Sequence, residues 1–122
     1  MPSLTTAVEI GSYGERIAAA FLRRRGYRVL TRNYRAEGGE IDLVCRDGDV
    51  LAFVEVRSRS GELFGRPSES IDARKENALL SAARSYLELL KRDDITWRFD
   101  AVEVHLKAGE APVCTLVPNI ME

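Results

Sequence analysis

The sequence has few of the residues that hold small secreted, zinc-binding or membrane-spanning domains together. Its two cysteines, Cys45 and Cys114, form neither a disulfide framework nor a zinc spacing. Both lie in apolar, strand-like runs, so we expect buried, reduced thiols and a cytoplasmic location. No apolar run approaches the roughly 20 residues of a membrane-spanning helix. The N-terminus has no basic start followed by an apolar stretch, so we expect no secretion signal.

Histidine and repeated sequence are also scarce. The one histidine, His105, has no evident cysteine or serine partner, so we interpret it as incidental. No repeat, low-complexity tract or linker interrupts the 122 residues, which is the length of one ordinary domain. We therefore predict a single domain over residues 1–122 with its core at about 8–106.

The formal net charge of −1 conceals an uneven distribution of charge. Seven arginines and no acid lie between Arg16 and Ala36, whereas acidic residues gather around 37–62 and in the C-terminal half. A basic stretch beside an acidic centre suits a polyanionic partner. The alternative is a solvated helix face carrying ordinary surface arginines.

Hydrophobic periodicity predicts an α/β fold with a mixed central β-sheet flanked by α-helices. We predict helices over about 6–25 and 72–92, with Gly26 ending the first and Ser70 or Asp72 capping the second. The predicted strands are 27–33, 40–46, 50–58, 97–106 and a short one at 113–117, with a loop over 59–69. The expected buried stripes are Ile10, Tyr13, Ile17 and Phe21 in the first helix, and Leu79, Ala82, Ala83, Tyr86 and Leu90 in the second.

Three carboxylates gather on a predicted hairpin that turns at Asp47-Gly48-Asp49. Because strand side chains alternate, Glu40 and Asp42 share one face with Glu55 in either of two registers. The Cβ atoms of Asp42 and Glu55 are then either directly opposite, at about 4.5–5.5 Å, or the acids pair diagonally at about 7–8 Å.

Such a cluster is unfavourable unless a cation lies among the acids, because like charges repel and raise one another's pKa. A divalent ion such as Mg²⁺ or Mn²⁺ resolves the conflict, since Mg²⁺ prefers oxygen ligands. The alternative is a structural ion-pair network in which Arg57, Arg59 or Lys75 neutralises the acids. The pattern of residues leaves both interpretations open.

Several motifs occur in an order that resembles the YraN family of bacterial proteins. They are Gly14-Glu15-Arg16-Ile17-Ala18, Arg32-Asn33-Tyr34-Arg35, Gly39-Glu40-Ile41-Asp42-Leu43-Val44, Phe53-Val54-Glu55-Val56-Arg57-Ser58-Arg59, Phe64-Gly65 and Arg98-Phe99-Asp100. This resemblance implies a restriction-endonuclease-like fold with a PD-(D/E)xK signature, similar to Holliday-junction resolvases. It also implies that Asp42 and Glu55 are metal ligands and that Glu15 is an additional acid from the helix.

The sequence departs from that signature at two positions. Ile41 stands where the signature has proline, and Arg57 stands where it has lysine. Arginine stays protonated, so it is a poor general base, although it can hold a phosphate or stabilise developing charge. We therefore expect a metal-dependent endonuclease that hydrolyses phosphodiester bonds with metal-bound water. A non-catalytic nucleic-acid-binding domain and a scaffold domain are the alternatives.

Other basic residues are candidates for contacts with DNA phosphates, which position a duplex but read no sequence. They are Arg23, Arg24, Arg25, Arg35, Arg59 and Lys75. Lys75 alternatively packs its stem on the core, and Glu15 alternatively pairs with Arg16 or Arg23. Trp97 and Phe99 belong to the core or an interface, and Asp100 is a second acid near the site or part of a structural pair. The resemblance also implies recognition of DNA by shape and a homodimer.

Overall fold

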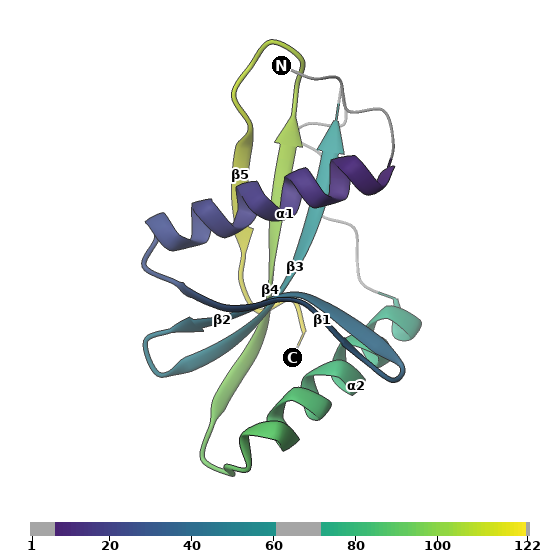
Figure 1. The fold of residues 1–122 in the computed structure, drawn as a ribbon, viewed down its shortest axis with the longest axis vertical. Helices are drawn as coiled ribbons and strands as arrows, with labels where there is room; N and C mark the ends of the chain where they lie inside the picture. Colours follow the sequence, from purple (N-terminus) through teal and green to yellow (C-terminus); the bar gives the residue numbers. More distant parts are fainter. Residues whose placement is uncertain (1–6, 61–71, 122) are drawn as a thin grey trace.

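The computed structural model describes residues 7–60 and 72–121, which form two helices and five strands (Figure 1). The elements are α1 (Ala7–Arg24), β1 (Arg28–Ala36), β2 (Gly39–Asp47), β3 (Val50–Ser60), α2 (Ala73–Leu90), β4 (Thr96–Leu106) and β5 (Val113–Val117). The predicted order is confirmed. Arg59, which we expected in a loop, lies on β3 because parallel pairing with β4 extends that strand as far as Ser60.

The strands form one mixed sheet in the order β1-β2-β3-β4-β5. Only β3 and β4 run parallel, and α2 connects them along the chain. The β2–β3 hairpin pairs Asp47 with Val50 and Leu43 with Val54, and Gly48 adopts a φ of 60° in its turn. If this register is extended by one residue pair, Asp42 lies directly opposite Glu55. The sequence allowed a direct and a diagonal pairing of these acids, and the structure has the direct one.

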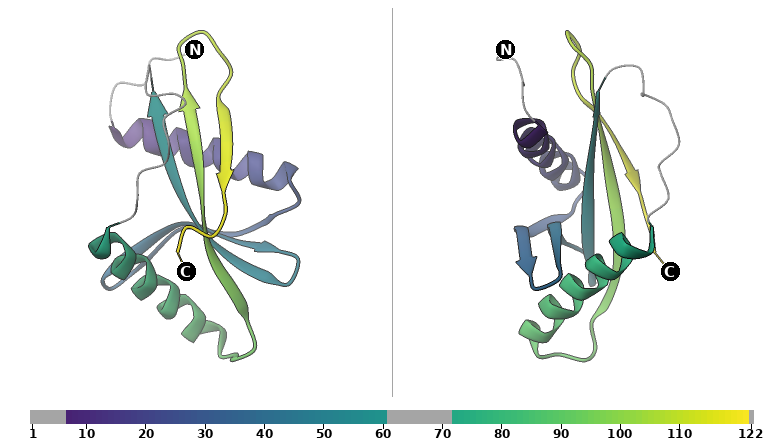
Figure 2. Two further views of the ribbon diagram at one scale, coloured as in Figure 1. Left: turned by 180° about the vertical axis from the view of Figure 1, so that it is seen from behind. Right: turned by 90° about the vertical axis from the view of Figure 1, so that its right-hand side faces the viewer.

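The two helices cover opposite faces of the sheet (Figure 2). Ala52 and Val54 pack in the cluster that contains α1, whereas Leu51 and Phe53 pack in the cluster that contains α2. This alternation is the period of two expected for a strand that is buried on both sides. Trp97 also packs on the α2 side, with its ring centroid 5.9 Å from that of Phe53, so it belongs to the core.

The buried face of α1 differs from the predicted stripe. Ala18, Ala19 and Leu22 are fully buried, whereas Ile17 and Phe21 are only partly buried at the edge of the cluster. Small alanines let the helix approach the sheet closely, so Ala18 and Ala19 occupy the centre of the contact together with Leu22. The prediction for α2 is confirmed at Leu79, Ala82 and Ala83, but Leu90 in the last turn is 38% exposed.

The helix boundaries follow from local signals that the sequence shows. Gly26 adopts a φ of 91° directly after α1, which suits glycine and ends the helix. At the start of α2, the Asp72 side chain accepts a 2.8 Å hydrogen bond from the backbone N–H of Lys75. Asp72 is therefore a cap of this helix, as predicted, while Ser70 lies outside the described residues.

Both cysteines are free thiols. Cys45 is fully buried on β2, and burial raises its pKa to about 12. Cys114 on β5 is only partly buried, contrary to the expectation that both would be buried alike. Neither α1 nor α2, the helices of the described ranges, has the length and apolar character needed to cross a bilayer.

Candidate functional site

The Asp42 carboxylate lies where β2 and β3 separate. Their pairing ends at Leu43 and Val54; beyond this point β2 continues beside β1, and β3 continues beside β4 (Figure 1). Here Oδ2 of Asp42 accepts a 2.8 Å hydrogen bond from the backbone N–H of Val56. The Asp42 side chain thus supplies a hydrogen-bond acceptor to the edge of β3 that no longer pairs with β2. This bond holds the carboxylate at the point where the two strands separate, which we call the fork.

A second carboxylate, Glu15, comes from α1. A Cβ on the preceding residue, Gly14, would overlap Oγ of Ser58 and lie 3.2 Å from Cβ of Ser58, so glycine permits the close contact of α1 with β3. Glu15 is partly buried, and its charge raises the pKa of Asp42. Glu15 therefore acts on Asp42 through its charge, and its role as an additional acid of the site stays a prediction.

The third carboxylate, Glu55 on β3, is only 13% exposed and lies between two cations. Its Oε1 is 3.1 Å from Nζ of Lys75, and its Oε2 is 3.4 Å from Nη2 of Arg57. Nη1 of Arg57 is in turn 3.9 Å from Oε2 of Glu103 on β4. The ion-pair network that we weighed as an alternative to a metal is therefore present around Glu55.

Two local features place Lys75 beside Glu55. The cap at Asp72 holds the backbone of the first turn of α2, including the N–H of Lys75. One turn later, α2 touches the start of β2: a Cβ on Gly39 would overlap the carbonyl oxygen of Ala78 and lie 2.7 Å from its carbonyl carbon. Glycine at position 39 thus allows backbone-to-backbone contact between α2 and β2.

The fork is electrostatically strained at Asp42. The pKa of Asp42 is raised from 3.8 to about 6, mainly by burial and also by the charges of Glu15 and Glu55. The Val56 N–H and the Lys75 ammonium act in the opposite direction but do not offset these effects.

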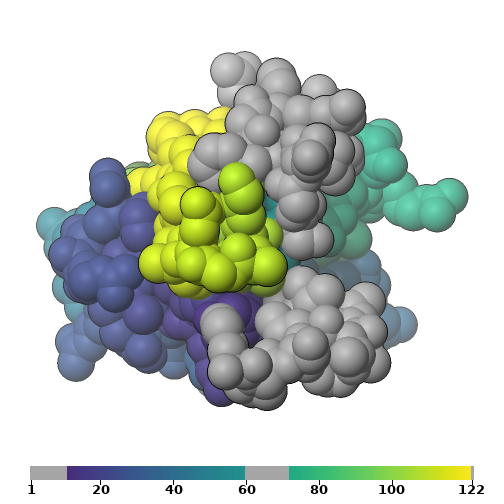
Figure 3. Space-filling model, turned by 90° about the horizontal axis from the view of Figure 1, so that it is seen from above, coloured from purple at the N-terminus to yellow at the C-terminus, as the bar shows by residue number. Residues whose placement is uncertain are grey.

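The helices that carry Glu15 and Lys75 lie on different sides of the β4–β5 connection when the molecule is viewed from above (Figure 3).

These residues fit a hard divalent cation held by a small number of oxygen ligands. A positive charge would relieve the repulsion among three carboxylates, and Mg²⁺ commonly takes one or two of them, with water or substrate oxygens at its other positions. Across residues 7–60 and 72–121, no group of three or more histidine, cysteine or acidic side chains is arranged to hold a metal. Asp42 and Glu55 are the two predicted ligands that lie opposite each other, and their binding of a metal stays a prediction.

Glu40, the remaining predicted metal ligand, lies opposite Arg35 in the β1–β2 pairing. Its Oε2 is 3.5 Å from Nε of Arg35, and its side chain is 44% exposed. The acids whose charges raise the pKa of Asp42 are instead Glu15 and Glu55. Beyond the fork β2 pairs with β1 and no longer with β3, so the ion-pair partner of Glu40 comes from β1. The role of Glu40 as a metal ligand stays a prediction.

The predicted phosphate contacts separate into two groups. Arg23, Arg24 and Arg25 are exposed at the C-terminal end of α1, about 12 Å along the helix from Glu15. Arg59 lies on β3, the strand that carries Glu55, Lys75 on α2 contacts Glu55, and Arg35 is 80% exposed near the β1–β2 turn. Contact of either group with a nucleic acid stays a prediction.

Sequence reasoning missed Glu103 and the surroundings of His105. Glu103 lies opposite Arg57 in the parallel β3–β4 register and is 4% exposed. Nε2 of His105 is 3.7 Å from Oε1 of Glu103, so this histidine is a buried neighbour of the ion-pair network rather than an incidental residue. Only the register of two strands that are distant in sequence brings these groups together, and no local motif signals it.

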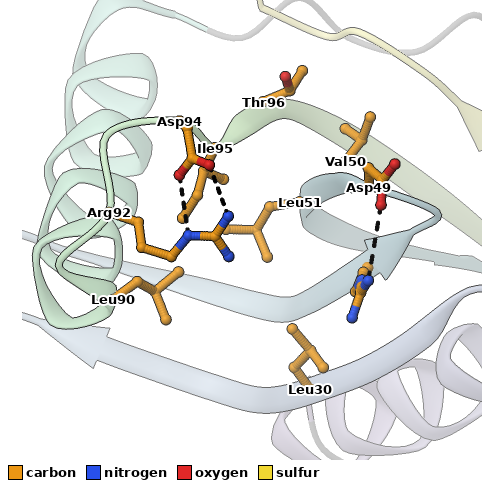
Figure 4. Close-up of a pocket in the computed structure, with 10 residues that line it drawn as sticks. Leu30, Asp49, Val50, Leu51, Leu90, Arg92, Asp94, Ile95 and Thr96 are labelled. Atoms are coloured by element: carbon orange, nitrogen blue, oxygen red, sulfur yellow. Dashed lines mark hydrogen bonds and ion pairs between the residues drawn. The ribbon is translucent and has the colours of Figure 1, made fainter.

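A surface hollow of about 500 Å³ lies away from the fork, between the β2–β3 turn and the C-terminal end of α2 (Figure 4). Leu30, Leu51 and Leu90 contribute apolar lining. Its charged groups pair with one another: Arg92 donates two hydrogen bonds to Asp94, at 3.0 and 2.9 Å, and Arg46 lies 3.9 Å from Asp49. The hollow therefore lacks the crowded carboxylates that mark the fork.

Comparison with known proteins gives a consistent family relationship. Residues 14–104 match the model of the uncharacterised protein family UPF0102. A UPF0102 protein of Symbiobacterium thermophilum is 43% identical over 110 residues, covering 90% of this chain and 93% of its own length. UPF0102 proteins of Syntrophus aciditrophicus and Clostridium kluyveri are 40% and 44% identical, covering 85% and 79% of this chain and 82% and 79% of their own lengths.

Proposed function

The chain belongs to the uncharacterised protein family UPF0102, which comprises YraN-like proteins, and from this premise we propose that it is a metal-dependent DNA endonuclease. The proposal includes a restriction-endonuclease-like fold and resolvase-like action on phosphodiester bonds. The observation that carries it is the fork: the Asp42 carboxylate is bound to the Val56 N–H beside Glu55, and the charge of Glu15 also acts there. Crowded, partly buried carboxylates of this kind are typical of functional sites.

In this proposal Asp42 and Glu55 hold Mg²⁺ or Mn²⁺. When bound, such an ion supplies Lewis acidity toward a water molecule and a phosphate oxygen. Glu15 orients the attacking water from the α1 side. Arg57, which is 13% exposed and lies between Glu55 and Glu103, stabilises negative charge on the phosphate but does not remove a proton.

The partner in this proposal is DNA recognised by shape, because the sequence shows no recognition helix or base-reading motif, and arginines that contact phosphates position a duplex without reading its sequence. A homodimer is part of the proposal, since cutting two strands of a branched DNA requires two sites. A cytoplasmic location agrees with the free thiols of Cys45 and Cys114.

The test is cleavage of linear, supercoiled and four-way-junction DNA in Mg²⁺ or Mn²⁺. We expect metal-dependent product from the wild type, and its loss in Asp42→Asn and Glu55→Gln. Asp49→Asn is the matched control, because Asp49 is a fully exposed acid at the tip of the same hairpin. Cleavage that survives both fork substitutions would refute this assignment of the site.

A second candidate function is nucleic-acid binding without cleavage. The observation that favours it is Arg57, which forms an ion pair with Glu55 and stands where the signature has a titratable lysine. This function predicts DNA binding that weakens steeply with salt and yields no metal-dependent product. Arg57→Lys separates the two candidates: activity that appears only in this variant would mean that the arginine silences the site.

A further inference from the structure

The two cations that contact Glu55, Arg57 and Lys75, differ in how exposed they are to solvent. Arg57 is 13% exposed and contacts a second, nearly buried carboxylate, Glu103, through Nη1. Lys75 is 49% exposed and reaches Glu55 from the first turn of α2. An exposed ion pair contributes little to stability, because solvent screens it and holding a long side chain in place is entropically unfavourable. Lys75 is therefore the cation that leaves Glu55 more easily.

The backbone of Lys75 does not move away with its side chain. Its N–H is bound to the cap residue Asp72 at 2.8 Å, and α2 rests against β2 at the contact between Ala78 and Gly39. An ammonium displaced from Glu55 consequently stays near the fork, where its charge already lowers the pKa of Asp42.

The geometry at Glu55 indicates where the displaced ammonium goes. A divalent ion on Glu55 takes the carboxylate that Lys75 contacts, so the ammonium loses its ion pair, whereas Arg57 retains a second carboxylate partner, Glu103. A substrate phosphodiester that approaches the ion brings negatively charged oxygens to the fork, and the displaced ammonium can pair with one of them.

Building on the proposed function, we propose that Lys75 exchanges with the divalent ion at Glu55 and then forms the subsite for a substrate phosphate. In the metal-free protein, Nζ of Lys75 contacts Oε1 of Glu55. An incoming ion must displace it, so the lysine competes with the ion for this carboxylate. With metal, the same ammonium contacts the DNA backbone. Lys75 thus links metal binding to DNA binding, a function that the bound arginine at position 57 is poorly placed to serve.

The test measures two affinities in three proteins: wild type, Lys75→Met and the control Arg74→Met, which removes a neighbouring exposed charge from the same helical turn. Titration calorimetry gives the affinity for Mg²⁺ without DNA. Fluorescence anisotropy with a labelled four-way junction in Ca²⁺ gives DNA affinity. We expect Lys75→Met to bind Mg²⁺ at least about fivefold more tightly and DNA at least about fivefold more weakly, the size of a small thermodynamic coupling. Arg74→Met should leave the Mg²⁺ affinity unchanged.

The outcomes separate the two proposals. If the wild type binds Mg²⁺ and Lys75→Met leaves that affinity unchanged or weakens it, the exchange is overturned. The proposed metal-dependent function is not affected by this outcome. Tighter Mg²⁺ binding with undiminished DNA affinity overturns the phosphate subsite. Absence of Mg²⁺ binding by the folded wild type, with its circular dichroism spectrum intact, overturns the proposed metal-dependent function together with the exchange.

Discussion

The backbone N–H of Val56 donates a 2.8 Å hydrogen bond to Oδ2 of Asp42 at the point where two strands of the sheet part. A hydrogen bond to a carboxylate normally lowers its pKa. Here the pKa of Asp42 is raised to about 6, because burial and the charges of Glu15 and Glu55 outweigh the bond. Without a cation, the ionised form of Asp42 therefore destabilises the fold, which leads to a direct prediction.

Asp42→Asn should stabilise the metal-free protein at pH 7.5 by up to about 3 kcal/mol. The folded-state pKa lies above the ordinary value of 3.8, so the folded protein binds the Asp42 proton more tightly than the unfolded chain does. The contribution of this group to stability is therefore highest below about pH 4, falls between about pH 4 and 6, and stays low above that. Asparagine keeps an acceptor for the Val56 N–H and removes the charge.

Urea unfolding in EDTA measures the difference in unfolding free energy between Asp42→Asn and the wild type. The measurement is repeated at about nine evenly spaced values across pH 3.5–8. The gap between Asp42→Asn and the wild type should close toward acid pH and open near neutrality. Asp49→Asn, at a fully exposed position, should follow the wild-type curve throughout. A variant that is less stable than the wild type at pH 7.5 would show that the carboxylate stabilises the fold even without a metal.

Gly39→Ala should destabilise the protein by about 1–3 kcal/mol or more, because the added Cβ would overlap the backbone of Ala78 and push α2 away from β2. Gly11→Ala, on α1, is the control. No atom from another part of the described chain lies within 4 Å of the Cβ position at Gly11, so alanine there should be neutral or stabilising by up to about 1 kcal/mol. Thermal or urea unfolding compares them, and equal effects of the two substitutions would contradict the close contact between α2 and β2.

Asp100→Ala should destabilise the protein by about 3–5 kcal/mol while leaving Mg²⁺ affinity at the fork intact. Asp100 is fully buried and accepts hydrogen bonds from Arg98, at 2.8 Å from Nε, and from the N–H of Asn119 at 2.9 Å. Removing it takes from a partly buried guanidinium its carboxylate at Asp100, while the contacts with Asp47 and Tyr27 remain. These contacts identify Asp100 as part of a structural network, one of the two interpretations that the sequence allowed.

Urea unfolding and Mg²⁺ titration of the same samples test both halves of that prediction. Asp94→Ala removes an exposed acid that pairs with Arg92, and it should leave the unfolding free energy almost unchanged. A large loss of Mg²⁺ affinity in folded Asp100→Ala would instead connect this network to the fork.

The elements could be predicted because their signals are local. The alternation around Phe53, the turn at Gly48 and the cap at Asp72 each require only a few neighbouring residues. Asp42 and Glu55 could be brought together for the same reason, since one short hairpin carries both. The contact between Arg57 and Glu103 could not, because it depends on the parallel register of two strands joined by α2. The ion pair of Glu40 with Arg35 also escaped prediction, since it depends on the register between β1 and β2.

Replacing Arg23 and Arg24 together by glutamine should weaken DNA binding uniformly across sequences and reduce the slope of log affinity against log salt by about two. Both side chains are exposed at the end of α1 away from Glu15, so they can contact phosphates without altering the acids. Fluorescence anisotropy at several salt concentrations, in Ca²⁺, measures the slope. Arg92→Gln is the control, because the Arg92 guanidinium is already bound to both oxygens of Asp94. An unchanged slope in the double variant would restrict the DNA-binding surface to the fork and its neighbours.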